Sequence, residues 1–393
     1  MDIDILRRNE NNEIIDHVEE IRKIISRKCS RCNSIGCMGC IFNSVDSDMI
    51  PSMLDNILDQ MGHVPNDRAE MVVAGKRNHR ERVTTWQKIA KGENKMNKSL
   101  HEHDTGNNSA LRAMRIDIYH QTIKIAQMGQ YEVSGKTVEL HDSERMMSDS
   151  VYYTEPPELG KTEPNQITEV KVMESDTLLS GKTLLDEGYN PAILNFASGS
   201  TPGGGVLRGA GAQEENIFRR TNLLLSLYQF HENGAKFNIP MREEHYPMYW
   251  KSGGIYTPGM AIFRGLEADG YPLLEEPYYL SVISVPAVNR PTLKDGDHLS
   301  DEMVEVTKTK MRSIFRIALL HGHDALVLGA WGCGAFKNHP HHIAQLFQEV
   351  LKEDEFRNRL SKIVYAVIDY AQNGNYQAFK EVIRTTEKDN ANI

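Results

Sequence analysis

The chain has 393 residues, of which 40% are hydrophobic and 25% are charged, and its net charge is −9. This length predicts two or three domains, and the composition is that of a globular protein with enough chain to bury a sizeable core. The negative charge argues against general adhesion to nucleic acid, although backbone N–H groups can still bind phosphate locally. We expect no membrane span, because no segment approaches about 18 consecutive apolar residues.

The first hundred residues are expected to form a helical extension that carries a metal module. Apolar residues recur at helical spacing between 14 and 25, and short helices are expected from 47 to 73. Between them, the pattern C-x2-C-x4-C-x2-C is formed by Cys29, Cys32, Cys37 and Cys40. Four thiolates satisfy a tetrahedral zinc ion, so a structural zinc is favoured, with an iron–sulfur cluster or free thiols as alternatives. The clustered cysteines, and an N-terminus without a secretory signal, predict a cytoplasmic protein.

A basic stretch and a polar segment mark the main boundary in the chain. Basic and polar residues are frequent from Lys76 to Lys98, which predicts a solvated face, with a polymeric anion as the alternative contact. Residues 92–108 are poor in apolar groups and are expected to be a linker. We therefore divide the chain into the N-terminal region 1–100, a helical accessory segment 101–150 that packs on the catalytic domain, and the catalytic domain 151–393.

From residue 110 onward, helical and strand-like patterns alternate. Helices are expected at 110–128, 178–186, 217–230, 303–320 and 343–351. Strands are expected at 137–140, 169–173, 192–196, 255–256, 260–263, 279–285, 325–328 and 363–368. This alternation predicts an α/β fold with a mainly parallel central sheet, in which ligands bind at the carboxyl ends of the strands.

The strand at 192–196 leads into the loop that contains Gly203, Gly204 and Gly205, and after seven intervening residues come Gln213, Glu214 and Glu215. Three consecutive glycines allow a sharp turn and a close approach to a ligand. The two carboxylates begin a helix, whose electropositive N-terminus favours both acidic side chains and bound phosphate. The pair could therefore be catalytic, or simply favourable acids at a helix start.

A second glycine loop follows the strand at 325–328. Its residues are Gly332, Cys333, Gly334, Ala335 and Phe336, and a helix follows that Asn338 can cap and that has Pro340 in its first turn. Two such loops predict a ligand with two phosphates. A nucleophilic Cys333 with a base among His339, His341 and His342 is an alternative, but small size at a phosphate loop already explains the cysteine. These histidines lack an acidic partner with ligand spacing, which argues against a metal site.

Four motifs in this order resemble the macrodomain-fold poly(ADP-ribose) glycohydrolases, most closely their compact microbial type. They are Leu194–Ser198, Pro202–Gly205, Ala212–Glu215 and Gly332–Phe336. The resemblance covers about residues 110–379 and implies a macrodomain-like three-layer sandwich with a mixed central sheet. It implies hydrolysis of the ribose–ribose O-glycosidic bonds of poly(ADP-ribose), from the chain end, with release of ADP-ribose and without a catalytic metal. Poly(ADP-ribose) or ADP-ribosylated macromolecules would be the partners, with no membrane and no direct nucleic-acid contact.

The resemblance also implies roles for individual residues. Glu215 would donate a proton to the leaving oxygen and then activate water, Glu214 would hold ribose hydroxyls, and Gln213 would position the pair. The glycine loops would wrap the diphosphate and the terminal ribose. One departure is Lys337, which stands where the family commonly has a small residue, and this puts substrate reach in doubt.

Three further site residues keep an ordinary structural alternative. Asn195 would contact ribose, or it is a satisfied loop asparagine. Asp176 would bind the adenine amino group, or it caps the helix that begins near Leu178. Phe336 would pack on the terminal ribose or the adjoining base, or it is a core aromatic.

Two other functions are compatible with the same fold. One is removal of single ADP-ribose units from protein or nucleic acid. The other is a non-catalytic reader that binds ADP-ribose and uses the cysteine module for targeting. The intact Gln213, Glu214 and Glu215 argue against the reader.

Overall fold

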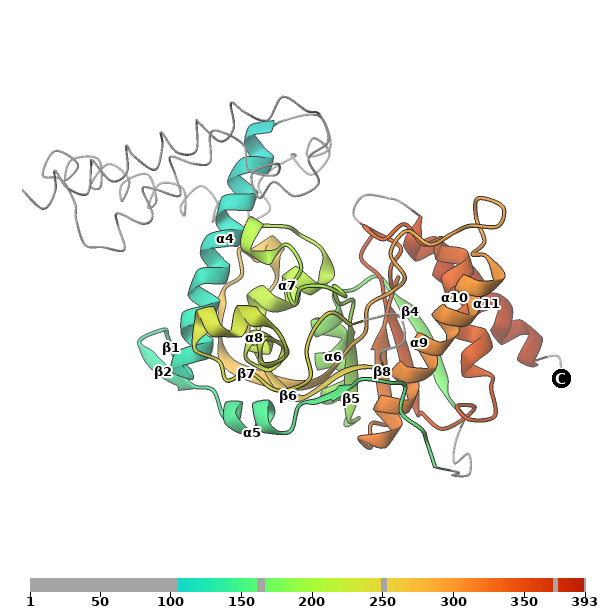
Figure 1. Cartoon of the computed structure of the whole chain (residues 1–393), viewed down its shortest axis with the longest axis horizontal. Helices are drawn as coiled ribbons and strands as arrows, with labels where there is room; N and C mark the ends of the chain where they lie inside the picture. The colour runs from blue at the N-terminus through green and yellow to red at the C-terminus, as the bar shows by residue number, and fades with distance from the viewer. Residues whose placement is uncertain (1–104, 161–166, 249–252, 370–373, 392–393) are drawn as a thin grey trace, which may run out of the picture. The chain divides into compact units, whose positions relative to one another are not determined.

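The computed structural model describes residues 105–160, 167–248, 253–369 and 374–391 (Figure 1). The helices expected at 14–25 and 47–73, the four clustered cysteines and the basic stretch 76–98 lie outside these residues. Helix α4 (Thr105–Met128) already begins inside the segment that we expected to be a linker up to residue 108. That expectation was wrong at its end, because a helix can continue for a turn beyond the apolar residues by which it is recognised.

A mixed seven-stranded sheet forms the centre of the described region, in the order β3-β6-β7-β5-β8-β9-β4. In that order the strands are β3 (Val151–Tyr153), β6 (Gly254–Arg264), β7 (Leu273–Ser284), β5 (Pro191–Asn195), β8 (Ala325–Leu328), β9 (Lys362–Ala366) and β4 (Glu169–Met173). The strands from β7 to β4 pair in parallel, and β6 is antiparallel to both of its neighbours. The mainly parallel sheet is therefore confirmed.

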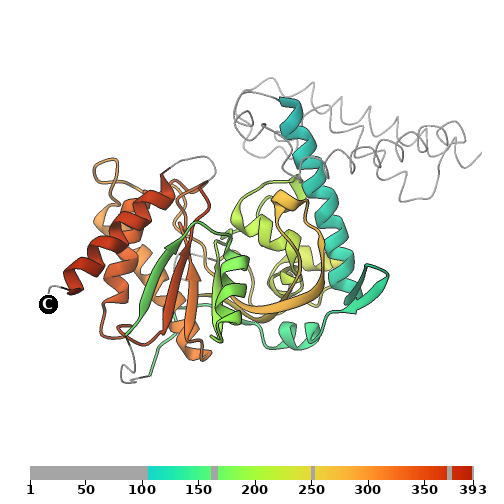
Figure 2. The ribbon, with the colours of Figure 1, turned by 180° about the vertical axis from the view of Figure 1, so that it is seen from behind.

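Strand β5 is buried along its whole length, and its residues alternate between two hydrophobic cores. Ile193 joins the core under α6 (Thr177–Asp186), α7 (Gln213–Arg220) and α8 (Leu223–Leu227). Ala192 and Leu194 join the core under α9 (Asp301–Leu320), α10 (Pro340–Leu351) and α11 (Asn375–Ala391). Helices therefore cover both faces of the sheet, as Figures 1 and 2 show, and this α/β architecture fits a macrodomain-like sandwich.

Smaller elements join the accessory segment to the sheet. A hairpin of β1 (Gln130–Val133) and β2 (Lys136–Glu139) follows α4, and α5 (Ser143–Ser148) leads into β3. Helix α4 contacts α7, α8 and the short helix η3 (Val206–Arg208). Among the described residues, we find no helix that is long and apolar enough to cross a membrane.

The single helix expected at 217–230 is wrong. The chain forms α7 and α8, followed by the 3-10 helices η4 (Tyr228–Phe230) and η5 (Glu232–Phe237). The break falls at Thr221, whose backbone is extended and forms a β-bridge with Ile262 of β6. Asn222 then accepts a hydrogen bond from the backbone N–H of Ala261 at 2.8 Å. Pairing with the sheet thus replaces helical hydrogen bonds at this point.

The two short strands expected at 255–256 and 260–263 are one strand, β6. It passes through Pro258 and Gly259, and its register against β7 shifts between Thr257 and Met260. A bulge is one of the few places where a strand tolerates proline, because the missing N–H needs no partner there. The three-residue strand β3 and the 3-10 helix η6 (Glu267–Asp269) were not expected.

Candidate active site

The carboxyl end of β5 and the first turn of α7 are joined through Gln213. Its Oε1 accepts a hydrogen bond from the backbone N–H of Phe196 at 2.9 Å, and its Nε2 donates to the carbonyl of Leu194 at 2.7 Å. Nε2 also lies 3.2 Å from Oγ1 of Thr177, at the start of α6. One side chain therefore fixes the N-terminus of α7 against the end of a central strand.

Glu214 is buried and anchored by hydrogen bonds to both carboxylate oxygens. Ser198 N–H donates to Oε2 at 2.8 Å, and Gly203 N–H donates to Oε1 at 3.1 Å. Nδ2 of Asn195 adds a longer contact to Oε1 at 3.4 Å. Burial raises the pKa of Glu214 to about 8, although the hydrogen bonds from Ser198 and Gly203 oppose this rise and the charge of Glu215 adds to it.

Glu215 is held differently. Its Oε1 accepts a hydrogen bond from the backbone N–H of Gly205 at 2.8 Å. Its Oε2 is buried and has no hydrogen-bond partner among the described residues. The side chain is thus oriented through one oxygen, while the other remains free to bond a substrate atom.

The glycine triplet makes this arrangement possible. Gly203 and Gly204 have positive φ angles of 77° and 53°, which residues with a side chain rarely adopt. A Cβ at Gly204 would lie 2.6 Å from Oε1 of Glu215, and one at Gly203 would lie 2.7 Å from the ring of Phe218. The loop can therefore reach both carboxylates only without side chains.

Asn195 lies fully buried at the end of β5, between Glu214 and Ser284 of β7. Its Nδ2 donates to Oγ of Ser284 at 3.1 Å, and its Oδ1 is buried without a partner among the described residues. Oδ1 of Asn195 and Oε2 of Glu215 are thus two buried oxygens without a hydrogen-bond partner among the described residues. Buried acceptors of this kind are expected to bond a ligand or an ordered water.

The second glycine loop follows β8, which pairs with β5 through Ile193 and Val327. The two loops therefore begin at the same edge of the sheet, and a Cβ at Gly329 would lie 2.9 Å from the ring of Phe196. Gly332 has a φ of 76°, and a Cβ there would lie 2.6 Å from both Ala287 and Asn338. The structure thus brings the starts of the two loops together.

Residues 120–265 match a family model described as the catalytic domain of microbial-type PARG. The poly(ADP-ribose) glycohydrolase of Thermomonospora curvata, also solved with the inhibitor ADP-HPD, is 32% identical over 68% of this chain and 98% of its own, with TM-scores of 0.58 and 0.57. The chain belongs to this family.

A second solved structure is the Deinococcus radiodurans poly(ADP-ribose) glycohydrolase in complex with ADP-ribose. It is 26% identical over 63% of this chain and 99% of its own, with a TM-score of 0.51. No curated protein matches. The resemblance inferred from the sequence motifs is thereby confirmed.

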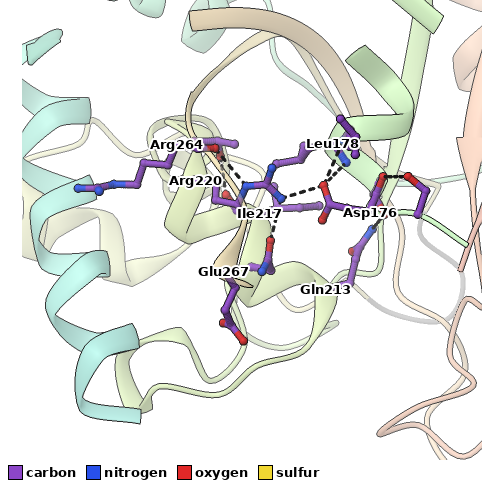
Figure 3. Close-up of polar contacts among 12 residues, drawn as sticks. Asp176, Leu178, Gln213, Ile217, Arg220, Arg264 and Glu267 are labelled. Atoms are coloured by element: carbon purple, nitrogen blue, oxygen red, sulfur yellow. Dashed lines mark hydrogen bonds and ion pairs between the residues drawn. The ribbon is translucent and has the colours of Figure 1, made fainter. Parts of the chain in front are cut away.

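In this microbial-type glycohydrolase, Asp176 acts as a helix cap. Its Oδ1 accepts from the backbone N–H groups of Leu178 and Leu179, each at 3.1 Å. The same oxygen accepts from Nη1 of Arg220 at 2.8 Å, so that α7 reaches across to the start of α6, as Figure 3 shows. Arg220 also donates to the carbonyl of Arg264 at 3.2 Å. Asp176 therefore caps α6, as one of the two interpretations of the sequence expected, and its contact with the adenine amino group stays a prediction.

The remaining residues of the second loop differ in exposure. Gly334 and Ala335 are exposed, whereas Phe336 is half-buried and packs against the core under α9 and α10. Burial raises the pKa of the Cys333 thiol, which argues against a thiolate nucleophile. Lys337 is exposed with a φ of 61°, a conformation that glycine adopts more readily than lysine.

The cap expected at Asn338 is wrong. His339 occupies the N-cap position of α10, without a side-chain cap, and Pro340 lies in the first turn as expected. Asn338 instead donates to the carbonyls of Val288 at 2.8 Å and Gly332 at 3.1 Å, because the glycine loop leaves those groups within its reach. Within the described ranges, no group of three or more His, Cys, Asp or Glu side chains could hold a metal ion.

Sequence reasoning missed the residues that support the site from outside the motifs. The hydroxyl of Ser284 accepts a hydrogen bond from Nδ2 of Asn195. Arg219 and Arg220, at the end of α7, resemble the basic residues that often close a helix, and nothing in their pattern indicates distant partners. Apart from Asn216, which lies on α7 itself, their acceptors lie outside the helix, so only the fold reveals them.

Proposed function

We propose that this protein hydrolyses the ribose–ribose O-glycosidic bonds of poly(ADP-ribose) and releases ADP-ribose. The observation that carries the proposal is the buried Oε2 of Glu215, which has no partner among the described residues while Oε1 is fixed by Gly205. Family membership, and the solved relatives with ADP-ribose and ADP-HPD, support this ligand class.

The chemistry follows from the different bonding of the two carboxyl groups. Cleavage of a glycosidic bond makes the anomeric carbon oxocarbenium-like, and the leaving oxygen then needs a proton. Glu215, through Oε2, would donate that proton and as carboxylate activate a water molecule. Glu214 keeps unused lone pairs on its anchored oxygens, and with Oδ1 of Asn195 it would accept hydrogen bonds from ribose hydroxyls.

Burial raises the pKa of Glu214 to about 8, so its carboxyl group can stay neutral at pH 7 next to the diphosphate of the ligand. The diphosphate would lie between the two glycine loops, where backbone N–H groups can bond phosphate oxygens. We assign this contact to Gly203, Gly204, Gly205, Gly332, Cys333, Gly334 and Ala335, with Phe336 against the terminal ribose or base and Asp176 toward the adenine.

We also propose that cleavage proceeds from the chain end, that the N-terminal region binds a zinc ion, and that the protein is cytoplasmic. A structural zinc ion at Cys29, Cys32, Cys37 and Cys40 fits the donor set of four thiolates, and metal analysis of the purified full chain tests it. Iron in place of zinc, or no metal, would contradict this assignment. The cytoplasmic location is tested by fractionation of cells that express the chain.

The proposed reaction is tested with Glu215→Gln, assayed for ADP-ribose release from poly(ADP-ribose) and for ADP-ribose binding by calorimetry. Loss of the proton donor should lower kcat by about 10²–10⁴-fold and leave the Kd for ADP-ribose within a few-fold. The matched control is Glu302→Gln, which removes an exposed acid from the first turn of α9. If Glu215→Gln lowers kcat no more than Glu302→Gln does, Glu215 only stabilises the N-terminus of its helix.

Two alternative functions are separated by the same assays. A wild type that binds ADP-ribose without cleaving the polymer would identify a reader. A wild type that leaves the polymer intact but releases ADP-ribose from a mono-ADP-ribosylated protein would identify a mono-ADP-ribosyl hydrolase.

A further inference from the structure

The loop Gly209–Ala212, which leads directly into Gln213, is contacted from outside by α4. Gly209 has a φ of 69°, and a Cβ there would lie 2.5 Å from the carbonyl oxygen of Arg112. The guanidinium of Arg115 covers Gly211, where an added Cβ would overlap it, and its Nη1 lies 3.4 Å from the carbonyl of Gly209. Small residues in the loop therefore let α4 pack against it.

Arg115 is itself fixed by Glu267 in the connection between β6 and β7. Nε and Nη2 of Arg115 donate to the two carboxylate oxygens at 2.8 and 2.6 Å. Burial opposes ionisation of Glu267, but hydrogen bonds from Arg115 and Tyr271 outweigh it and lower the pKa of the carboxyl group. Such a two-bond pair fixes the plane of the guanidinium as well as its position.

A second arginine, Arg219, holds the same loop from the side of α7. It is fully buried, and its Nη1 donates to the carbonyl of Ala210 at 2.7 Å. Its Nε donates to the hydroxyl of Tyr271 at 2.8 Å, and that hydroxyl donates in turn to Glu267. We name these four residues, Arg115, Arg219, Glu267 and Tyr271, the loop bracket.

The loop bracket is connected to Glu215 through the backbone. The N–H of Ala210 donates to the carbonyl of Gly205 at 3.2 Å, and this hydrogen bond closes the turn between the two residues. The N–H of Gly205 in turn holds Oε1 of Glu215. Contact therefore runs from Arg219, through Ala210 and Gly205, to the carboxyl group that would transfer the proton, while Arg115 holds Gly209 and Gly211 on either side of Ala210.

We propose that Arg115 is a positioning residue for Glu215, acting through the loop bracket without touching either carboxylate. This inference rests on the proposed hydrolase function. A displacement of about 1 Å of a catalytic group can cost about 10²-fold in rate, so loss of Arg115 acts on kcat more than on ligand binding.

The experiment compares Arg115→Ala, Arg115→Lys and Gly211→Ala in the full chain. Arg115→Ala should lower kcat for ADP-ribose release by about 10- to 100-fold, with KM and the Kd for ADP-ribose within about twofold of wild type. Arg115→Lys should recover only part of this loss, because lysine cannot form the two-bond pair with Glu267. Gly211→Ala displaces the guanidinium with Arg115 still present, and should show the same loss in kcat.

The matched control is Arg312→Ala on α9. Arg312 forms a comparable two-bond pair with Glu353, at 2.8 Å for both Nε–Oε2 and Nη2–Oε1. Its loss should lower the free energy of unfolding without lowering kcat. The double variant Arg115→Ala/Gly211→Ala should be no slower than the slower single variant, because both changes remove the same contact.

Three results would overturn the proposal. One is a kcat loss for Arg115→Ala no larger than that for Arg312→Ala. Another is a kcat loss matched by an equal loss of ADP-ribose affinity, and the third is additive losses in the double variant. A wild type that releases no ADP-ribose would overturn the hydrolase function itself, whereas an active wild type with unaffected variants overturns the positioning role alone.

Discussion

Glu214 and Glu215 are adjacent in sequence, but their surroundings give them different chemistry. Glu214 accepts hydrogen bonds on both oxygens, so its position is fixed. Glu215 is fixed through Oε1 and leaves Oε2 unbonded among the described residues. The hydrogen-bonding pattern therefore supports the assignment of sugar binding to the first residue and proton transfer to the second.

At this scale we predict the pH dependence of ligand binding. The pKa of Glu214 is raised to about 8, so its carboxyl group is neutral below that pH and ionised above it. We expect the Kd for ADP-ribose to decrease above pH 8, because an ionised carboxylate accepts stronger hydrogen bonds from ribose hydroxyls than a neutral carboxyl group does. Calorimetry between pH 6 and 10 checks this, with Glu214→Gln, which cannot ionise, as the control. A Kd that stays constant up to pH 10 would contradict it.

At the scale of elements, the two glycine loops should respond differently to a single methyl group. Gly204→Ala introduces a Cβ 2.6 Å from Oε1 of Glu215 in a backbone with a φ of 53°. The carboxyl group must move, and we expect kcat to fall by about 10²-fold. Steady-state kinetics measure this effect, and an unchanged kcat would show that the loop does not fix Glu215.

Gly334 lies in open space, with no atom within 4 Å of an added Cβ. Gly334→Ala should therefore leave the free energy of unfolding within about 0.5 kcal/mol of wild type. If the second loop wraps the diphosphate, the methyl group should still weaken ADP-ribose binding about tenfold, since it occupies the space next to the backbone N–H groups. Calorimetry and urea denaturation separate the two effects, and unchanged affinity would place the diphosphate elsewhere.

Much of the fold could be predicted from sequence, because its central elements present simple patterns. Strands β5 and β8 are short apolar runs, and α9 has a clear apolar face. The break at Thr221 could not be predicted, since it depends on pairing with Ile262, far along the chain. The same holds for the site, where the motifs indicated Glu214, Glu215 and the glycines but gave no sign of Arg115 or Glu267.

At the scale of the whole molecule, two histidines hold the sheet together at the edge opposite the active site. Nε2 of His323 accepts from the hydroxyl of Tyr256 at 2.9 Å, while its Nδ1 donates to the carbonyl of Asn190, which precedes β5. His321 stacks on the ring of Tyr256 and bonds the hydroxyl of Tyr153 at 2.9 Å. Burial lowers the pKa of both rings, that of His321 to about 4.

These histidines predict a loss of stability in mild acid. A ring whose pKa is lower in the folded state than the usual 6.5 binds its proton first in the unfolded chain, so stability falls as the pH drops from about 6.5 toward 4. We expect Tm to decrease by several degrees between pH 7 and pH 5. Calorimetry of wild type and His321→Phe, which keeps an aromatic ring against Tyr256, measures the difference. An equal decrease in both proteins would contradict a contribution from His321.

The spacing of the residues that anchor the site limits how the sequence can change. The groups that fix the two carboxylates and Gln213 are mostly peptide N–H groups, those of Phe196, Ser198, Gly203 and Gly205. Outside the glycines, the identity of the side chain at such a position matters little, whereas the number of residues between the anchors matters greatly. A single insertion or deletion between Ser198 and Gln213 should therefore be far more damaging than an exchange such as Ser198→Ala, which removes only the hydrogen bonds that the Ser198 hydroxyl forms with Ser200 and with the N–H group of Thr201.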